Sequence, residues 1–512
     1  MNRFQRAIIR LVAPKTLRKN RSARSYQGAL ISRLTADWRS SQLSPDAEVR
    51  QGLRKLRDRS RELIRNNPYA KQAKRSTQLN IVGTGMDFQS RVKQIRGNKK
   101  DERINDLIEE KWAEWSEATN CDCAGKHSFH EFEWLMAGAL PESGECIFRI
   151  VRQPFGESKV PLALQVIESD LLDEEYSGAT LAKGNEWRNG VEVDSWGRAV
   201  RYSIMSRHPG DAYYLTNQGK QKQNLLVPAK DIIHLFLPER PSQNRGVPWF
   251  HPVMDDLHQL SGFEEAAVIR ARIGASITGF ITNNSGELIG DDIENNERLQ
   301  DFAPGEFRYL APGEGITVPD IDYPHQQYEM FVKNKVRRFA AGFGCSYETI
   351  SKDFSETNYS SSRLSLLEDR THWQFCQRYI IKNFHKRIFK EWLSLAVLAG
   401  ELDFPDYASR PSRYCKPVWI PPTQHYIDPL KEVKAYREAE QAGYMSKSQV
   451  IAMSGGGDYD DIIREISREQ DVAKGLGVTL DKDLDLTIEE GQLELDLPEV
   501  KQVSKTKKRS KK

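Results

Sequence analysis

The chain has 512 residues, 38% of them hydrophobic, and a formal net charge of +3 at pH 7, a composition that suits about three domains. No apolar run approaches the roughly eighteen residues that cross a bilayer, and Arg10 interrupts the only apolar patch at the start of the chain, so we predict neither a membrane span nor a signal peptide. Six scattered cysteines without framework spacing predict free thiols in a cytoplasm.

The positive charge is concentrated at the start of the chain. Residues 1–75 hold 20 Lys/Arg and 5 Asp/Glu, a net charge of +15, so the remainder carries −12. Such an arm can bind nucleic acid or an acidic protein surface, or it can be a solvated helix face, and the sequence leaves these readings open. Residues 45–65 predict an amphipathic helix, capped by Ser44, with an apolar stripe of Val49, Leu53, Leu56, Leu63 and Ile64.

Residues 70–245 alternate between strand-like and helical patterns. Strands are predicted at 79–86, 161–169, 190–205 and 231–240, with a hairpin turn at 194–198. Helices are predicted at 102–118 and 131–140. This order indicates an α+β unit.

Two helices then bracket a glycine-rich, polar stretch with strand signals. The first, within 246–275, has an apolar face of Val253, Leu257, Leu260, Phe263 and Ala267. The second, within 324–344, has an apolar stripe of Tyr328, Val332, Val336 and Phe339. It also carries four basic residues within six positions, namely Lys333, Lys335, Arg337 and Arg338.

A polar segment, 345–362, is predicted to be a loop that opens into one long helix over 363–400. Ser360, Ser361 and Ser362 can cap the helix start, and Gly400 can end it. Such a helix would be roughly 55–60 Å long, which suits an elongated subunit better than a compact enzyme. Its apolar residues recur mostly at steps of three or four, at Leu364, Leu367, Phe375, Ile381, Phe384, Ile388, Trp392 and Val397.

After Gly400 a strand-like connector leads to two predicted helices, one running from Asp428 to Gly443 and the other opening at Asp458. The last residues, 478–512, are poor in aromatics, acidic and then lysine-rich, so we expect disorder there.

No complete catalytic motif occurs. The chain lacks a P-loop, a dinucleotide-binding GxGxxG and HExxH. Cys121, Cys123, His127 and His130 could bind zinc, but their spacing is tighter than usual, and a loop leading into a helix is the simpler interpretation. The carboxylates of Asp353, Glu356, Glu368 and Asp369 could suggest a nuclease metal site, but we expect them to be helix-surface charges. We therefore predict no catalytic residue, no cofactor and no metal.

Several segments resemble the lambda-type portal proteins of tailed bacteriophages. They include RNNPYAKQAKRSTQLNIVGTGM, NGVEVDSWGRAVRYSIMSRHPGD, RPSQNRGVPWFHPVMDDLHQLSGFEEAA, ISKDFSETNYSSSRLSLLEDR and IDPLKEVKAYREAEQAG. The resemblance runs in order from about residue 66 to residue 477, roughly four fifths of the chain.

The resemblance implies an elongated α+β subunit that assembles into a ring. It assigns residues 1–44 to a basic arm, 45–245 to the wing, 246–275 and 324–344 to the two stem helices, and 276–323 to a clip. It assigns 345–362 to a tunnel loop, 363–400 to a long helix, 401–477 to a crown and 478–512 to a tail. The implied function is a dodecameric ring at one capsid vertex of the virion, assembled in the host bacterial cytoplasm, through which double-stranded DNA passes without sequence recognition. Implied partners are further copies of the chain, terminase, capsid and scaffold proteins, and head-completion or tail-joining proteins, without a membrane.

A channel should attract phosphate weakly without reading bases. In the tunnel loop the candidate DNA-facing residues are Asp353, Thr357, Asn358, Tyr359, Ser360, Ser361 and Arg363; on the stem they are Arg270, Arg272, Lys333, Lys335, Arg337 and Arg338. The stem cations could instead pair with acids of a neighbouring subunit, such as Glu264 and Glu265. Two other classes stay open: a basic DNA-binding enzyme, such as a nuclease or recombinase without a channel, and a scaffold that binds acidic proteins.

Overall fold

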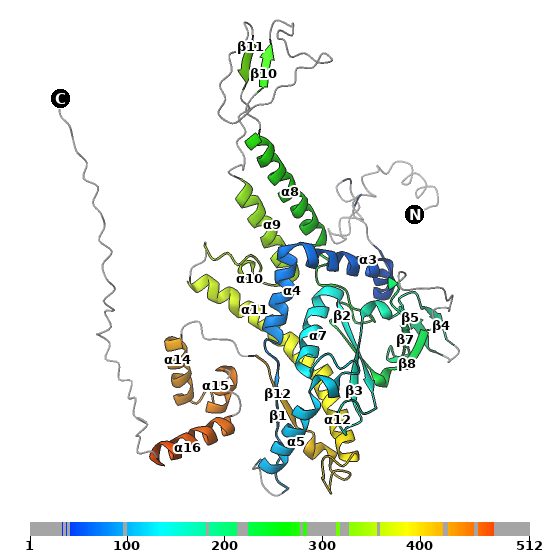
Figure 1. Cartoon of the computed structure of the whole chain (residues 1–512), viewed down its shortest axis with the longest axis vertical. Helices are drawn as coiled ribbons and strands as arrows, with labels where there is room; N and C mark the ends of the chain where they lie inside the picture. The colour runs from blue at the N-terminus through cyan, green and yellow to red at the C-terminus, as the bar shows by residue number, and fades with distance from the viewer. Residues whose placement is uncertain are drawn as a thin grey trace, which may run out of the picture. The chain divides into compact units, whose positions relative to one another are not determined.

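The computed structural model describes residues 33, 37, 41–95, 100–180, 184–211, 224–276, 280–283, 314–317, 327–355, 359–422, 429–454 and 459–475, some of them within helices and strands by their backbone alone. The chain divides into two units, Met1–Pro422 and Thr423–Lys512, and the fold is mixed α+β, as predicted (Figure 1). The tail 478–512, nearly all of the arm 1–44 and most of the predicted clip 276–323 lie outside the described residues.

The first unit begins with two capped helices, α3 (Pro45–Asn66) and α4 (Pro68–Ile81). The Ser44 side chain accepts a hydrogen bond from the Ala47 amide, which confirms the predicted cap of α3. The predicted strand 79–86 is wrong, because α4 runs to Ile81 and β1 (Asp87–Ser90) begins only later. The Asn67 cap followed by Pro68 starts a helix whose tertiary packing overrides the local strand propensity of its last residues.

Two antiparallel sheets follow. In the first, β2 (Glu145–Val151) lies between β3 (Ala163–Ile167) and β9 (Ile232–Phe236). The second runs in sequence order through β4 (Gly178–Ala179), β5 (Glu186–Arg188), β6 (Val191–Val193), β7 (Ala199–Met205) and β8 (Asn224–Pro228). Single 3₁₀ turns precede the second sheet and β9, at Ser169–Leu171 and Ala229–Asp231. The predicted hairpin at 194–198 is confirmed, with the Asp194 amide bonded to the Arg198 carbonyl and Gly197 at φ 76°.

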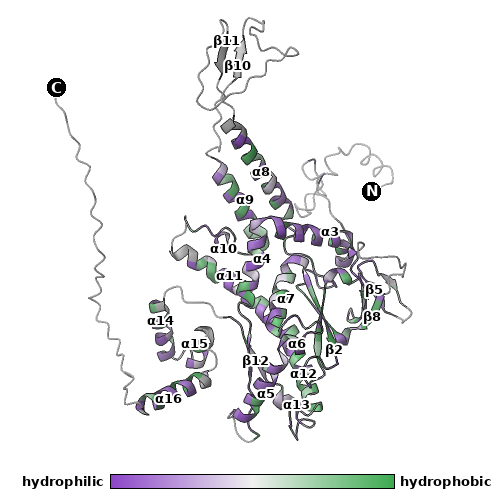
Figure 2. Ribbon diagram, in the orientation of Figure 1, coloured by the Kyte–Doolittle hydropathy of each residue, from purple (hydrophilic) through white to green (hydrophobic). Residues whose placement is uncertain are grey.

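Helices α6 (Ala118–Cys121) and α7 (Phe129–Ser143) pack on β3 and β2 of the first sheet, and α5 (Glu102–Trp115) packs on β1. Apolar residues (green) gather on α7, α12 and β2 in Figure 2, where α3 is mostly hydrophilic. At the end of α7, Gly144 adopts φ 83°, and a Cβ there would overlap the backbone of Val247, so only glycine lets α7 turn into β2 at this place.

The two predicted stem helices are present as α8 (Met254–Ser276) and α9 (Tyr328–Phe343). They pack side by side, and beyond them the strands β10 (Phe280–Asn283) and β11 (Glu314–Thr317) pair antiparallel (Figure 1). Leu257 and Leu260 are buried as expected, whereas Phe263 is 38% exposed and packs against the rings of Tyr328 and Phe331.

The polar segment after α9 is more ordered than predicted. It contains α10 (Tyr347–Ser351), and α11 (Tyr359–Ile380) begins at Tyr359, ahead of the serines expected to cap it. The predicted loop 345–362 is therefore wrong in part.

The predicted long helix is interrupted by a π-helical turn. Ile381–His385 form this turn between α11 and α12 (Lys386–Leu398), and Gly400 follows the helix end at φ 77°, as expected. The predicted apolar stripe holds only in the second half. Leu364, Leu367 and Phe375 are exposed, and the buried residues of α11 are instead Asp369, Trp373, Cys376, Gln377 and Ile380.

The connector after Gly400 contains α13 (Pro411–Tyr414) and β12 (Pro417–Ile420), which pairs with β1. Residues 401–422, expected to open the crown, therefore belong to the first unit. The described part of the second unit has three helices, α14 (Pro429–Gln441), α15 (Lys447–Ser454) and α16 (Tyr459–Gly475), where two were predicted. α15 was missed although Ser446 and Gln449 form a reciprocal cap at its start. Within the described ranges, no helix is long and apolar enough to span a membrane.

Candidate nucleic-acid interface

The six candidate stem cations lie on α8 and α9. Arg270 and Arg272, near the end of α8, are exposed, as are Arg337 and Arg338 on α9. The side chains of Lys333 and Lys335 are only 16% and 24% exposed, so contacts within the subunit hold them.

Asp256 joins the two stem helices. Its carboxylate lies 3.0 Å from Lys335 Nζ and 2.8 Å from Arg338 Nε, and its side chain is 13% exposed. The partner of these cations is thus an acid of the same chain. Because the Arg338 side chain is 70% exposed, its other N–H donors stay accessible to an anion, whereas Lys335 serves chiefly to tie α9 to α8.

Lys333 connects the stem to the segment after α10. Its Nζ lies 2.8 Å from the Glu329 carboxylate, one turn away, and 3.8 Å from that of Asp353. Hydrogen bonds from Ser355, and one from the Tyr347 hydroxyl, lower the pKa of Asp353, so this tunnel-loop candidate is ionised. A carboxylate repels phosphate, so the geometry suits Asp353 to hold Lys333 and the loop in place.

The remaining tunnel-loop candidates cluster at the start of α11. Thr357 and Asn358 lie outside the described residues, and Tyr359, Ser360 and Ser361 form the first helical turn, described by backbone alone. Arg363 follows them and is exposed.

Asp369 is a buried cap and not the surface charge that we predicted. Its side chain accepts hydrogen bonds from the Ser346 amide (2.9 Å), the Ser346 hydroxyl (2.7 Å) and the Thr349 hydroxyl (2.8 Å), and it is 5% exposed. It therefore caps α10 from a position 23 residues away in sequence. Glu368 is exposed, as predicted.

In this structure the side chains of Cys121, His127 and His130 contact other groups of the chain and not one another. The Cys121 thiol donates to backbone carbonyls, and burial raises its pKa and raises that of Cys123 to about 11, which disfavours the thiolates that zinc requires. His127 Nδ1 lies 3.2 Å from the Asp122 carboxylate, and His130 Nδ1 lies 3.0 Å from that of Glu133. Ser128 and Glu131 form a capping box that opens α7, so the simpler interpretation, a loop leading into a helix, is confirmed.

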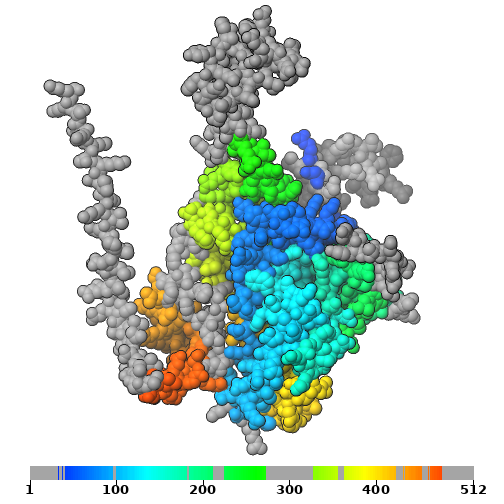
Figure 3. Space-filling model, viewed as in Figure 1, coloured from blue at the N-terminus to red at the C-terminus, as the bar shows by residue number. Residues whose placement is uncertain are grey.

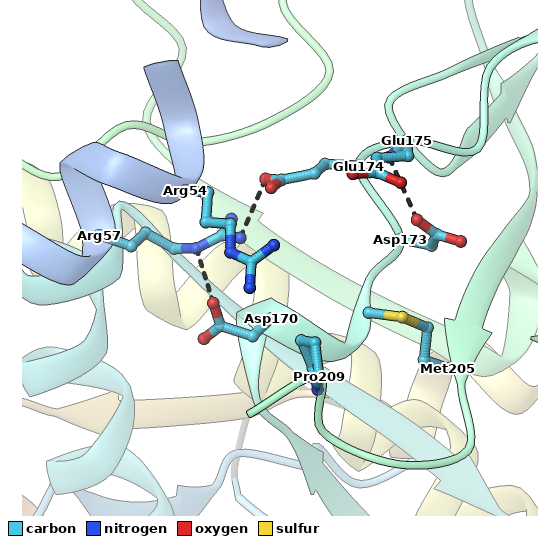
Figure 4. A pocket seen from close by; sticks show the side chains of 8 residues that line it. All are labelled: Arg54, Arg57, Asp170, Asp173, Glu174, Glu175, Met205 and Pro209. Atoms are coloured by element: carbon cyan, nitrogen blue, oxygen red, sulfur yellow. Dashed lines mark hydrogen bonds and ion pairs between the residues drawn. The ribbon is translucent and has the colours of Figure 1, made fainter. Parts of the chain in front are cut away.

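Elsewhere in the described ranges, Glu168, Asp170 and His208 are close enough to share a cation. Two arginines already occupy Asp170, however. Arg57 Nε lies 3.2 Å from its carboxylate, and Arg61 pairs with its second oxygen. Figure 4 shows Arg57 between Asp170 and Glu174 at the wall of a small pocket, an arrangement that joins α3 to the segment after β3.

A second buried ion pair was missed by the sequence analysis. Arg245 and Glu145 are both fully buried; Nη2 of Arg245 lies 2.6 Å from Glu145, and the guanidinium also donates to the carbonyls of Leu172, Asn189 and Ser169. His234 lies 3.0 Å from the same carboxylate. The charge of Arg245, followed by the hydrogen bond from His234, keeps the pKa of Glu145 far below its usual range despite burial. No local pattern marks these residues, because they meet across 100 positions.

In the described part of the chain, the ionisable clusters described above tie helices and strands together. These clusters are structural contacts within the subunit of a mixed α+β protein. The family model described as "Phage portal protein, lambda family" matches residues 32–377. The chain belongs to this family, and it is accordingly a portal protein, a head–tail connector component of the virion.

Named relatives agree with this assignment. The chain is 30% identical over 464 residues to the probable portal protein of Halomonas phage phiHAP-1, covering 89% of this chain and 88% of the relative. It is 22% identical over 467 residues to portal protein B of Escherichia phage lambda, covering 84% and 86%. A chain from the neck of an empty gene transfer agent particle aligns with a TM-score of 0.41 at 14% identity, covering 79% of this chain and 94% of that one.

Proposed function

We propose that twelve copies of this chain form a ring at one capsid vertex, through which double-stranded DNA enters during packaging and leaves during ejection. The observation that carries the proposal is the pair α8–α9, whose exposed Arg270, Arg272, Arg337 and Arg338 lie on helices that lead to the β10–β11 hairpin. Exposed guanidinium groups attract phosphate without reading bases, which a moving duplex requires.

In this proposal, residues 276–323 form the clip that receives terminase and later the head-completion or tail-joining proteins. The wing, 45–245, seats in the capsid shell, and the start of α11 approaches the DNA. Terminase supplies the energy for packaging, consistent with the absence of a P-loop in the sequence. No observation favours a nuclease or recombinase, and family membership argues against one.

Negative-stain electron microscopy of the purified full-length chain, combined with light scattering, tests the ring. Twelve copies of 58.7 kDa give about 700 kDa, and we expect rings with a central hole at that mass. A chain that stays monomeric or dimeric at high concentration would contradict the proposal.

A further inference from the structure

The outer face of α3 and α4 carries basic side chains without a carboxylate partner. In the described part of the chain these residues are exposed and make no ion pair: Arg50, Lys55, Arg59, Arg65, Lys71 and Arg75, here called the basic face. Some exposed cations elsewhere in the same unit have carboxylate partners. Arg240 pairs with Glu48 at 2.8 Å, and Arg201 pairs with Glu192 at 2.5 Å.

Burial separates two kinds of cation on α3. Arg57 and Arg61 point inward with Leu53 and Leu63 and are taken up by wing carboxylates. The cations of the basic face are exposed. Of the exposed acidic residues of α3, Glu48 already pairs with Arg240, which leaves Asp58 and Glu62 near these cations. α4 contains no acidic residue at all.

This charge is unfavourable without a partner. Lys55 and Arg59, and Lys71 and Arg75, are like charges at i,i+4 spacing, each pair destabilising a helix by about 0.2–0.5 kcal/mol. Figure 3 shows α3 and α4 uncovered on the face in view, so no described segment compensates the charge there. An external polyanion would.

Two classes of polyanion could fit, DNA and an acidic protein. Protein interfaces centre on buried aromatic or aliphatic anchors. Among the described side chains of α3 and α4, Leu79 is the one exposed large apolar residue, so the anchors of a protein interface are lacking. Arginine and lysine alone suffice for phosphate, and 22 residues of α3 span about 33 Å, close to one turn of B-DNA.

We infer that the basic face binds double-stranded DNA through its phosphates, without reading sequence, as a contact additional to the stem cations. The charge continues in sequence, since residues 1–44 hold 10 Lys/Arg and one Asp. The inference does not depend on a central channel, because the basic face belongs to each subunit by itself.

Binding of the full-length chain to a fluorescent 30-base-pair duplex of random sequence, measured by anisotropy from 50 to 200 mM NaCl, tests the inference. The test variant combines Arg50→Gln, Lys55→Gln, Arg59→Gln and Arg65→Gln. If these side chains contact up to four phosphates, the slope of log K against log salt should become shallower by about 3 to 4, and affinity at 100 mM should fall at least tenfold.

A matched control removes four cations that already have carboxylate partners: Lys111→Gln, Arg152→Gln, Lys159→Gln and Arg201→Gln. The control changes the net charge equally and should keep its affinity within about threefold. Thermal unfolding checks that both variants fold.

Three outcomes would overturn the inference. The test variant could keep the wild-type salt slope, the control could lose as much affinity as the test variant, or a polyglutamate peptide could bind the basic face while DNA does not, which would assign an acidic protein partner. Electron microscopy of the same samples separates this result from the ring proposal. Intact rings with reduced DNA affinity support the basic face, whereas a wild type without rings contradicts only the ring.

Discussion

Glu145 and Arg245 place opposite charges in the core, where neither can be hydrated. Moving an ion out of water costs several kcal/mol, and the cost is recovered only with good geometry and further hydrogen bonds. Here Arg245 donates to Glu145 and to three backbone carbonyls, and the Gly246 amide and His234 complete the carboxylate's shell. The pair therefore holds β2, the turn after β3 and the entry to the stem in one arrangement.

Arg245→Met should lower the free energy of unfolding by about 3–5 kcal/mol, because it leaves Glu145 buried without its cation. Urea denaturation followed by tryptophan fluorescence measures the change. Arg240→Met is the control, since its pair with Glu48 is half exposed, and it should cost about 1 kcal/mol or less. Equal losses in the two variants would contradict the role assigned to Arg245.

At the scale of elements, the position of the capping residue determines whether a helix can be predicted from the local sequence. Ser44, Asn67 and Ser128 are local caps, and the sequence can reveal the helices they open. α10 has no side-chain cap from its own N-cap residue and depends on Asp369 of α11. A contact across 23 residues leaves no local signal, which explains why this segment was predicted to be a loop.

Asp369→Ala should loosen α10 and cost about 1–3 kcal/mol, because the Ser346 amide and two hydroxyls lose a buried acceptor. Hydrogen exchange read by mass spectrometry should show faster exchange in peptides covering 346–352. Glu368→Ala, the exposed neighbour, should leave that exchange unchanged. Unaltered exchange in Asp369→Ala would show that α10 does not depend on this cap.

At the scale of the whole molecule, periodicity and turn signals identified the α+β class, the helices α8 and α9 and four of the strands. They missed what depends on tertiary context: the extension of α4 through 79–81, the burial of Asp369 and the charge cluster around Glu145. Of the candidate site, the sequence supplied the cations, but only the structure could show that Asp256 neutralises two of them. The assignment to portal proteins came from extended sequence resemblance, which the family comparison confirmed.

Buried carboxylates should make the chain acid-sensitive. Arginine, histidine or backbone donors hold the pKa values of Asp122, Glu133, Glu145 and Asp170 below their usual ranges in the folded state. The unfolded chain, with ordinary pKa values near 4, then binds protons first, so this stability is present above about pH 5 and is lost as pH falls.

The thermal midpoint of the first unit should therefore drop steadily from pH 5 to pH 3, as measured by circular dichroism. His130 acts in the opposite sense. The hydrogen bond to Glu133 raises its pKa, so its contribution is complete below about pH 6.5 and is lost on further alkalinisation. A midpoint that does not change between pH 5 and pH 3 would contradict the role of the carboxylates.

The π-helical turn at Ile381–His385 determines which side of α12 faces the core relative to α11. Each α-helical residue rotates the chain by about 100°, and a π turn accommodates one residue more than an α turn. In an uninterrupted α-helix, Ile388 and Trp392 would be rotated by about that angle from the direction in which Trp373 and Ile380 are buried. The extra residue cancels the offset, so α11 and α12 bury the same side. In evolutionary terms, the turn absorbs a single insertion, and a relative lacking one residue here would present the same side through a regular helix.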